Sequence, residues 1–263
     1  MQGEGSLEYD SLLGLLRRTL TQSPFGKVRV VPEVTVKQDE PEQFDPTDAA
    51  SVAAFAVRRL RDPSSEVRHA AIECLQRDFP TLQRQESDVA ELLHDQESWF
   101  VRRAAISALA RLPLDAPSAW RYFGAPLTAD LSAEVRAAAA RALAGLPAEH
   151  ATQLRDLAWE DLVRATSDES WGVRATAVRA LGNLATANGI DPIARTLADE
   201  AAAVRVAALE ALAALQPTTD VLAPHAGRLA TLGDDAQPEV QLAAQALARV
   251  MGSIDAERGV GRV

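Results

Sequence analysis

The stretch Asp168-Glu-Ser-Trp-Gly-Val-Arg-Ala-Thr-Ala-Val-Arg-Ala-Leu181 decides the fold, because it is one of several near-copies. Each copy begins with an aspartate and ends with an alanine-leucine pair or a near variant of it. Between them lies a valine, which is followed by arginine in every copy except the last. Five good copies and a weaker sixth occupy residues 62–75, 95–109, 130–143, 168–181, 199–212 and 235–247. A fixed internal period indicates repeated supersecondary units instead of one globular domain.

The valine within each copy marks the period of the repeat. It stands at positions 67, 101, 135, 173, 204 and 240, so successive units lie 31 to 38 residues apart. Apolar residues follow it at helical spacing, which in the first copy gives Val67, Ala71, Cys74 and Leu75. Turns rich in aspartate, serine and proline precede it and favour helix N-termini. Residues 48–250 are therefore predicted to form six helical hairpins that cover one another's apolar stripes.

The boundaries of these helices follow from the same pattern. The first helices of the pairs are predicted at Asp48–Arg61, Ser87–His94, Ala116–Pro126, Glu149–Thr166, Pro192–Leu197 and Asp220–Leu232. The second helices are predicted to begin near Glu66, Phe100, Ala133, Gly172, Ala202 and Pro238. Alanine at the contact positions lets the helix axes approach closely, so a larger side chain there would push neighbouring repeats apart.

The unit Asp-x-x-x-x-Val-Arg-x-Ala-Ala-x-x-Ala-Leu resembles the short HEAT repeat of the kind first recognised in phycobilin lyases, the HEAT-PBS type. The resemblance covers roughly residues 48–250. It implies an all-α, right-handed α-solenoid whose second helices line a concave face, and an interaction scaffold more often than an enzyme. The sixth copy departs from the pattern, because Gln241 replaces the arginine and the copy is one residue short, as expected of a C-terminal cap.

An arginine follows the valine in five of the copies. These residues are Arg68, Arg102, Arg136, Arg174 and Arg205. In four of the copies a turn aspartate precedes the arginine by six residues, so the arginines can meet turn carboxylates of their own or of adjoining repeats. We expect a structural ladder of ion pairs that fixes the stacking register, in preference to an anion-binding stripe.

The flanking segments do not belong to the repeat. In residues 1–47, leucines between Leu7 and Leu20 fall largely on one helical face, valines between Val28 and Val36 alternate as in a strand, and residues 38–46 form an acidic linker. Residues 251–263 are expected to be a tail. The amphipathic segment Leu7–Leu20 has two interpretations: it either caps the first repeat or docks on another protein.

Composition excludes several classes of function. The formal net charge of −10 argues against general binding to nucleic acid, and the same charge disfavours a DNA-processing HEAT protein with a basic groove. Cys74 is the only cysteine, so no internal disulfide is expected, which fits a reducing cytoplasm. The sequence shows neither a signal peptide nor an apolar stretch of membrane-spanning length, so a cytoplasmic protein without membrane contact is expected.

No motif for catalysis stands out. The four histidines lack metal-ligand spacing, and the His-Glu pairs with which HEAT enzymes of the deoxyhypusine hydroxylase type bind iron do not occur. Walker and paired-cysteine zinc signatures are also absent, and Cys74 reads as a buried, inert thiol. We therefore expect no catalytic residue, no cofactor and no metal. An alternative that the repeat subtype suggests is a subunit of a bilin lyase or a related protein-modifying complex.

The candidate binding residues are those that the repeat does not dictate. Six positions after each valine stand Glu73, Ser107, Arg141, Arg179 and Glu210, and two positions after it stands Arg103 in the second copy. If the second helices line the groove, Arg103, Arg141 and Arg179 make its middle basic. The hypothesis is a non-enzymatic adaptor that receives an acidic peptide or protein surface there; the alternative is an ordinary solvated face.

The aromatic residues of the turns are also candidates. Trp99 and Trp171 occupy matching turn positions, and two interpretations explain this recurrence equally well: aromatic anchors of an interface, or packing against the turn of the next repeat. Of the two residues, Trp171 is expected to pack. Phe100 is expected to be the more exposed aromatic of the second copy, and it is added to the candidate partner-binding residues because aromatic anchors are favoured at interfaces.

Overall fold

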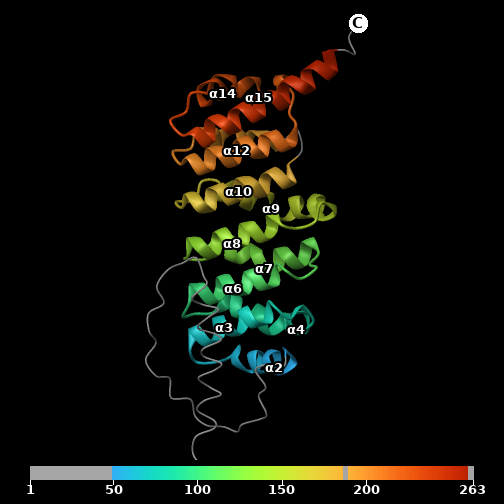
Figure 1. Ribbon diagram of the computed structural model, residues 1–263, viewed down its shortest axis with the longest axis vertical. Coiled ribbons are helices and arrows are strands. Elements are labelled where there is room, and N and C mark those ends of the chain that lie inside the picture. The colour runs from blue at the N-terminus through green and yellow to red at the C-terminus, as the bar shows by residue number, and fades with distance from the viewer. Residues whose placement is uncertain (1–48, 186–188, 260–263) are drawn as a thin grey trace, which may run out of the picture. The chain divides into compact units, whose positions relative to one another are not determined.

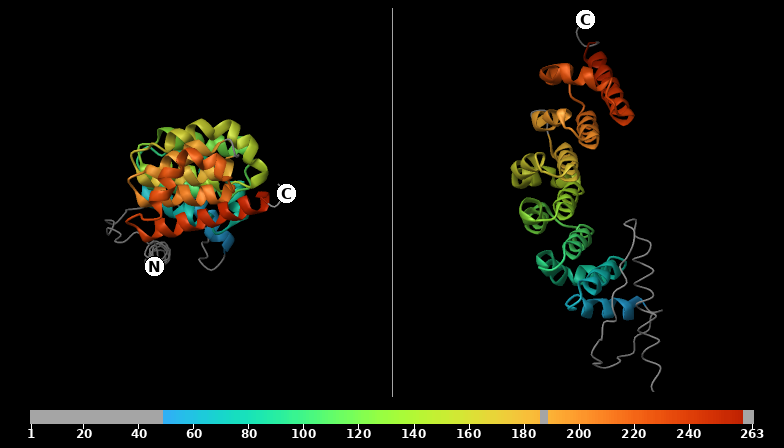
Figure 2. Two further views of the ribbon diagram at one scale, coloured as in Figure 1. Left: turned by 90° about the horizontal axis from the view of Figure 1, so that it is seen from above. Right: turned by 90° about the vertical axis from the view of Figure 1, so that its left-hand side faces the viewer.

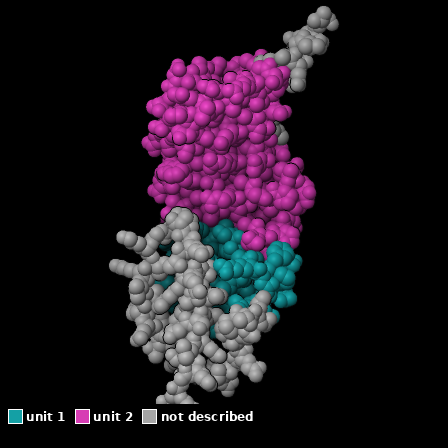
Figure 3. All heavy atoms as spheres, in the orientation of Figure 1, with its two compact units in different colours: residues 1–109 teal, residues 110–263 magenta. Residues whose placement is uncertain are grey.

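The computed structural model describes residues 49–185 and 189–259. The helix, the strand-like valines and the linker predicted in residues 1–47 lie outside this part. Within the described part the regular secondary structure is helical and contains no strand. The chain divides into two compact units, residues 1–109 and residues 110–263, which are described separately (Figure 3). Among the described helices, none is both long and apolar enough to cross a membrane.

Unit 1 contains two helical hairpins in its described part. Helix α2 (Ala49–Arg59) packs against α3 (Ser65–Leu75), and α3 in turn packs against α6 (Trp99–Leu109). The chain between α3 and α6 forms α4 (Phe79–Arg84), α5 (Glu86–Glu91) and a 3-10 turn at Leu92–His94. Helix α4 was not predicted. It begins where the Asp78 carboxylate accepts a hydrogen bond of 3.4 Å from the Thr81 amide, with Pro80 in its first turn.

Unit 2 contains four further hairpins (Figure 1). Their first helices are α7 (Ala116–Ala129), α9 (Ala151–Ala165), α11 (Ile190–Arg195) and the pair α13 (Thr219–Leu222) and α14 (Ala226–Leu232). Their second helices are α8 (Ala133–Ala144), α10 (Trp171–Leu184), α12 (Ala202–Leu215) and α15 (Pro238–Gly259). The second helices pack in sequence order, and within this unit the first helices form a separate layer (Figure 2). The predicted all-α solenoid of hairpins is confirmed.

The predicted helix starts agree closely with the structure. Each second helix begins within one residue of its expected start. Some helices run longer than predicted, since α7 continues past Pro126 to Ala129 and α15 continues past residue 250 to Gly259. The single helix predicted at Asp220–Leu232 is wrong, because a 3-10 turn at Ala223–His225 separates α13 from α14. The helices predicted at Ser87–His94 and Pro192–Leu197 likewise end as 3-10 turns. A proline inside a helix costs about 3 kcal/mol. In α7 this cost is offset because Phe123 and Leu127, on either side of the proline, are buried in the core.

Small residues set the distance between second helices. A Cβ atom added at Gly182 of α10 would lie 2.7 Å from the Cβ of Ala211 in α12. Real Cβ atoms do not approach so closely, so the two helices require a glycine at this crossing. This contact also gives the direction of the stack: the position seven residues after the opening valine, here Ala211, faces the preceding repeat.

The outer face of the final repeat is polar. Gln245 of α15 is exposed at the repeat position where Val178 and Leu209 are fully buried. Gln241 replaces the arginine of the other copies, and its amide donates a hydrogen bond of 2.6 Å to the Asp235 carbonyl of its own turn. The sixth copy thus lacks the apolar stripe on which another repeat would pack. It also lacks the arginine that would bind the turn aspartate of that repeat.

Candidate partner-binding face

The helix arginines connect successive turns, as Arg174 shows in unit 2. Its Nη1 donates to the carbonyl of Asp168 in its own turn at 2.9 Å. Its Nε and Nη2 donate to the two carboxylate oxygens of Asp199, in the following turn, at 2.7 and 2.9 Å. Both side chains are nine-tenths buried. The ladder prediction is therefore sharpened: the arginine meets its own turn through backbone carbonyls and the next turn through a carboxylate.

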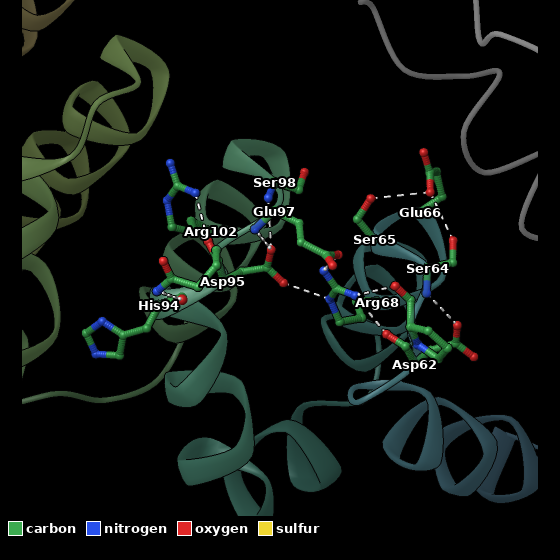
Figure 4. Close-up of polar contacts among 12 residues, drawn as sticks. Asp62, Ser64, Ser65, Glu66, Arg68, His94, Asp95, Glu97, Ser98 and Arg102 are labelled. Carbon is green, nitrogen blue, oxygen red and sulfur yellow. Dashed lines mark hydrogen bonds and ion pairs between the residues drawn. The ribbon is translucent and has the colours of Figure 1, made fainter.

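The same arrangement occurs elsewhere in each unit. In unit 2, Arg136 binds Asp168 at 2.7 and 2.9 Å. In unit 1, Arg68 lies between the Asp62 carbonyl at 2.8 Å and the Asp95 carboxylate at 2.7 Å (Figure 4). The Arg102 guanidinium donates to the Asp95 carbonyl at 2.8 Å. These arginines are occupied by the fold, which leaves other residues to bind a partner.

The turn aspartates serve two neighbours at once. Asp199 binds Arg174 and also accepts a hydrogen bond of 2.8 Å from the Ala201 amide at the start of α12. Burial alone would raise the pKa of Asp199, but the hydrogen bonds from Arg174 and from the amide outweigh it and hold this pKa below its ordinary value. The same balance lowers the pKa of Asp168. Both carboxylates remain charged partners of the ladder.

Within unit 2, the ladder is weakest at Arg205. Its Nη2 donates to Asp235 at 2.7 Å, but its Nε is buried without a hydrogen-bond partner. The next turn also carries Ala236 where the preceding turns carry Glu169 and Glu200, so no second carboxylate follows the aspartate there. Arg205 consequently has a poorer set of contacts than Arg174.

The second-helix face consists of the residues six positions after each opening valine. In unit 2 these are Arg141, Arg179 and Glu210, and all three are exposed. Arg179 lies 3.8 Å from Glu210 on the next helix, so one of the three arginines of the predicted basic strip is partly neutralised. Since α8 and α10 pack side by side, Arg141 and Arg179 project from adjacent helices.

In unit 1 the candidate residues Glu73, Phe100 and Arg103 belong to one cluster with His69 and Trp99. Arg103 stacks over the Trp99 ring at 5.4 Å, and Phe100 meets the rings of His69 and Trp99 edge-on at 5.4 and 6.1 Å. His69 lies 3.8 Å from Glu73, whose Oε2 atom is buried without a hydrogen-bond partner. The structure therefore brings residues of α3 and α6 together into a mixed aromatic and charged surface.

The expected exposure of the aromatics is wrong in two places. Trp99 is 41% exposed whereas Phe100 is half-buried, and Trp171, expected to pack against a turn, is 57% exposed. Each tryptophan is the first residue of its helix, α6 or α10. The sequence does contain a signal for Trp99, since Arg103 follows it at the four-residue spacing that brings helical side chains together.

The environment of His69 leads to a prediction about pH. Burial lowers the pKa of His69 below its ordinary value of 6.5, with a further contribution from Arg103 that Glu73 opposes. The unfolded chain then binds a proton at this site more readily than the folded chain. We therefore expect the stability of unit 1 to fall as the pH drops below about 6.5.

The measurement is urea denaturation at pH 7.5 and 5.5 for the parent protein and for His69→Gln. The substitution should reduce the difference in unfolding free energy between the two pH values. His94→Gln, at an exposed position of the same unit, should retain the full difference. An unchanged difference in the His69 variant would contradict the assignment.

Other chemistry is not visible in the described part of the chain. There, no group of three histidine, cysteine or acidic side chains could hold a metal ion. Cys74 is half-buried instead of fully buried as expected, and burial raises the pKa of its thiol. Two open clefts of unit 2, with volumes of about 420 and 580 Å³, lie along α9 and include none of Arg141, Arg179 or Glu210. The second-helix face thus lies outside these clefts.

Comparison with known proteins agrees with this architecture. The family described as HEAT repeats matches residues 52–144, 123–213 and 159–248. A designed armadillo repeat protein in complex with the peptide (KR)4 is 24% identical with a TM-score of 0.56, over 75% of this chain and 98% of that protein. An engineered protein is 22% identical with a TM-score of 0.56, over 76% and 96% of the two chains.

A computationally designed armadillo repeat protein for modular peptide recognition is 23% identical with a TM-score of 0.53, over 74% of this chain and 98% of that protein. No curated protein matches the sequence. At these identities the solved structures show the fold alone. The family match spans residues 52–248, which is most of the repeat region and more than half of the sequence. The chain therefore belongs to the HEAT-repeat family.

Proposed function

We propose that this protein is a non-enzymatic adaptor that binds an acidic peptide or protein surface along its second helices. The observation that carries the proposal is the contrast between two sets of arginines in unit 2. Arg136 and Arg174 are buried in the ladder, whereas Arg141 and Arg179 are exposed on the same helices. The repeat itself accounts for the first set but does not dictate the second. Exposed cations can attract an acidic partner and set its register.

The charges of unit 2 define an orientation for that partner. Arg141 and Arg179 lie on α8 and α10, whereas the equivalent residue of α12 is Glu210, 3.8 Å from Arg179. An acidic segment would be attracted over α8 and α10, and a basic residue that follows it would suit α12. A partner carboxylate would compete with Glu210 for Arg179. The order of charges on α8, α10 and α12 would thus select both the chain direction and the charge pattern of a bound partner segment.

Unit 1 offers a second kind of contact. Trp99 presents an exposed ring whose neighbours, Phe100 and Arg103, hold it against α6. Tryptophan and arginine are over-represented among the residues that dominate binding energy at protein interfaces. We propose that this cluster, with Glu73 at its edge, binds an apolar or aromatic side chain of a partner.

The fold and its relatives support a peptide-binding role in general terms. One structural neighbour was solved with a basic peptide, (KR)4. The charge of the second-helix face in unit 2 favours the opposite sign for this protein. We further propose that the repeats are of the HEAT-PBS type and that the protein acts in a reducing cytoplasm. The first rests on the repeated Val-Arg-x-Ala-Ala unit, and the second on the single cysteine of the sequence.

The test is charge reversal at the exposed arginines. Arg141→Glu/Arg179→Glu should weaken binding of a fluorescent peptide of alternating glutamate and leucine by about tenfold, or ~1.4 kcal/mol. The control, Arg164→Glu/Arg195→Glu, carries the same change in net charge on the exposed surface of the first helices. Fluorescence anisotropy should show that the control retains most of the affinity and that binding by the parent protein declines with salt.

Cross-linking and affinity purification from the native host, with the same two variants, would extend the test to the natural partner. The proposal fails if the two double variants bind the peptide equally, since the location of the charges would then be irrelevant. A tetrapyrrole titration separates the adaptor from the alternative of a bilin lyase subunit: a change in the pigment's absorption spectrum would favour the latter.

A further inference from the structure

The N-terminal end of unit 1 presents an apolar face. We define this end face by Val52 and Ala56 of α2 and by Val67, Ala71 and Cys74 of α3. These residues line a shallow pocket of about 20 Å³. Arg59 stacks on the Phe55 ring at 4.9 Å at the edge of the same pocket. The end face is therefore a small apolar surface with Arg59 at its rim. Val52, Val67 and Cys74 are half-buried, and Ala56 and Ala71 beneath them are buried.

The repeat geometry gives the direction in which this face points. Ala211, seven residues after its valine, packs against Gly182 of the preceding repeat. Cys74 occupies the equivalent position of α3, and Val67 and Ala71 share its side of the helix. On the other side of α3, the Gln76 amide donates to the Ala104 carbonyl of α6 at 3.4 Å. The end face thus points away from α6, toward the place that a preceding repeat would occupy.

The burial of the same positions differs between the first repeat and the later ones. The valines at 101, 135, 173, 204 and 240 are fully buried, whereas Val67 is half-buried. At the position seven residues later, Ala108, Ala180 and Ala211 are buried, whereas Cys74 and Ala142 are half-buried, so the valine position carries the contrast. The repeat pattern is intact at Val67, so the difference arises from position in the stack. The first described repeat has an interface-type surface that the other described helices do not cover completely.

We propose that the segment Leu7–Leu20 of the same chain docks on this end face and serves as the N-terminal cap of the repeats. The segment carries six leucines, at positions 7, 12, 13, 15, 16 and 20, and their helical spacing predicts an apolar stripe. An apolar stripe matches the chemistry of Val52, Val67 and Cys74. Stacked repeats require terminal caps because an open apolar end is otherwise left in contact with water.

The covalent connection favours this occupant over a second copy of the chain. Residues 21–48 join the segment to α2, and a chain of that length can cover the breadth of a helical hairpin. A tethered segment has an effective concentration in the millimolar range for a short flexible linker. The entropy cost of closing such a loop also rises only slowly with its length. A second molecule at micromolar concentration would compete poorly for the same face.

Cys74 makes the proposal directly testable, because it is the only cysteine and lies in the end face. The experiment measures how fast the native full-length protein reacts with 5,5′-dithiobis(2-nitrobenzoic acid). In the variant Leu13→Asp/Leu16→Asp, the segment carries two charges in its apolar stripe and should dissociate from the end face. Cys74 should then react at least about tenfold faster than in the parent. This ratio corresponds to a docked state that is more stable than the undocked state by ~1.4 kcal/mol. The melting temperature should fall as well.

The matched control is Leu131→Asp/Leu242→Asp, which makes the same chemical change at exposed leucines of unit 2. It should leave the Cys74 rate unchanged. Equal rates in the parent and the Leu13/Leu16 variant would overturn the proposal. A parent rate that falls as protein concentration rises, with a matching increase in mass, would also overturn it in favour of a second copy. Far-UV circular dichroism verifies that the variant compared is folded.

Discussion

Replacing Arg174 with alanine is expected to lower the free energy of unfolding of unit 2 by about 3–5 kcal/mol. The guanidinium makes two hydrogen bonds to Asp199 and one to the Asp168 carbonyl, and its removal leaves the Asp199 carboxylate nine-tenths buried without its cation. An uncompensated buried charge accounts for most of the loss, since the pair itself contributes little net free energy relative to apolar residues. Urea denaturation followed by circular dichroism measures the change.

Two further variants show whether the ladder contacts are responsible. Arg205→Ala should destabilise less, by about 1–3 kcal/mol, because Arg205 makes one hydrogen bond to Asp235 and its Nε has no partner. Arg164→Ala, which removes an exposed ion pair with Asp161, should change the stability by no more than about 0.5 kcal/mol. A loss in Arg174→Ala that is no larger than in Arg205→Ala would contradict the assigned roles.

Two glycine-to-alanine changes in helices are expected to have effects of opposite sign. Gly182→Ala should destabilise by about 1–3 kcal/mol, because the new Cβ would stand 2.7 Å from the Cβ of Ala211 and 3.3 Å from its Cα. The helix backbone of α12 must then shift. Gly252→Ala in α15 has nothing within 4 Å of the added Cβ and should stabilise by about 0.5–1 kcal/mol through helix propensity.

Thermal and urea denaturation of both variants provide the comparison. The substitution is chemically identical, so the difference between the two isolates the contact between repeats from the intrinsic preference for alanine. Similar stabilisation in both variants would show that α10 and α12 can separate at no cost. In that case the close approach at Gly182 would not set the spacing of the stack.

The sequence predicted the elements that the repeat determines. The starts of the second helices, the buried valines and the recurring arginines all follow from one pattern, because each repeat is in nearly the same environment. The predictions failed where the environment varies. Helix α4 arises from a local cap at Asp78 that the period does not contain, and α7 passes through Pro126 because buried neighbours offset the loss of a hydrogen bond.

The candidate face was predicted less completely than the fold. The positions of Arg141, Arg179 and Glu210 followed from the repeat, and all three are exposed. Spacing along one helix, however, does not give distances between helices, so the ion pair of Arg179 with Glu210 was not foreseen. The exposure of Trp99 and Trp171 was missed for a related reason: it depends on which neighbouring elements cover each ring, and a linear pattern does not specify them.

The ladder has a polarity that bears on how such a protein can be lengthened. In unit 2 a segment cut from the middle of one first helix to the middle of the next carries one acceptor and one donor. In the segment that holds Asp168 and Arg174, Asp168 accepts a hydrogen bond from Arg136 of the preceding repeat. Arg174 donates a hydrogen bond to Asp199 of the following repeat. Any such module fits head-to-tail between two others, as heterologous contacts allow. When such a module is duplicated or transplanted, the chain should therefore be joined inside the first helices, because a junction there separates no arginine from its aspartate.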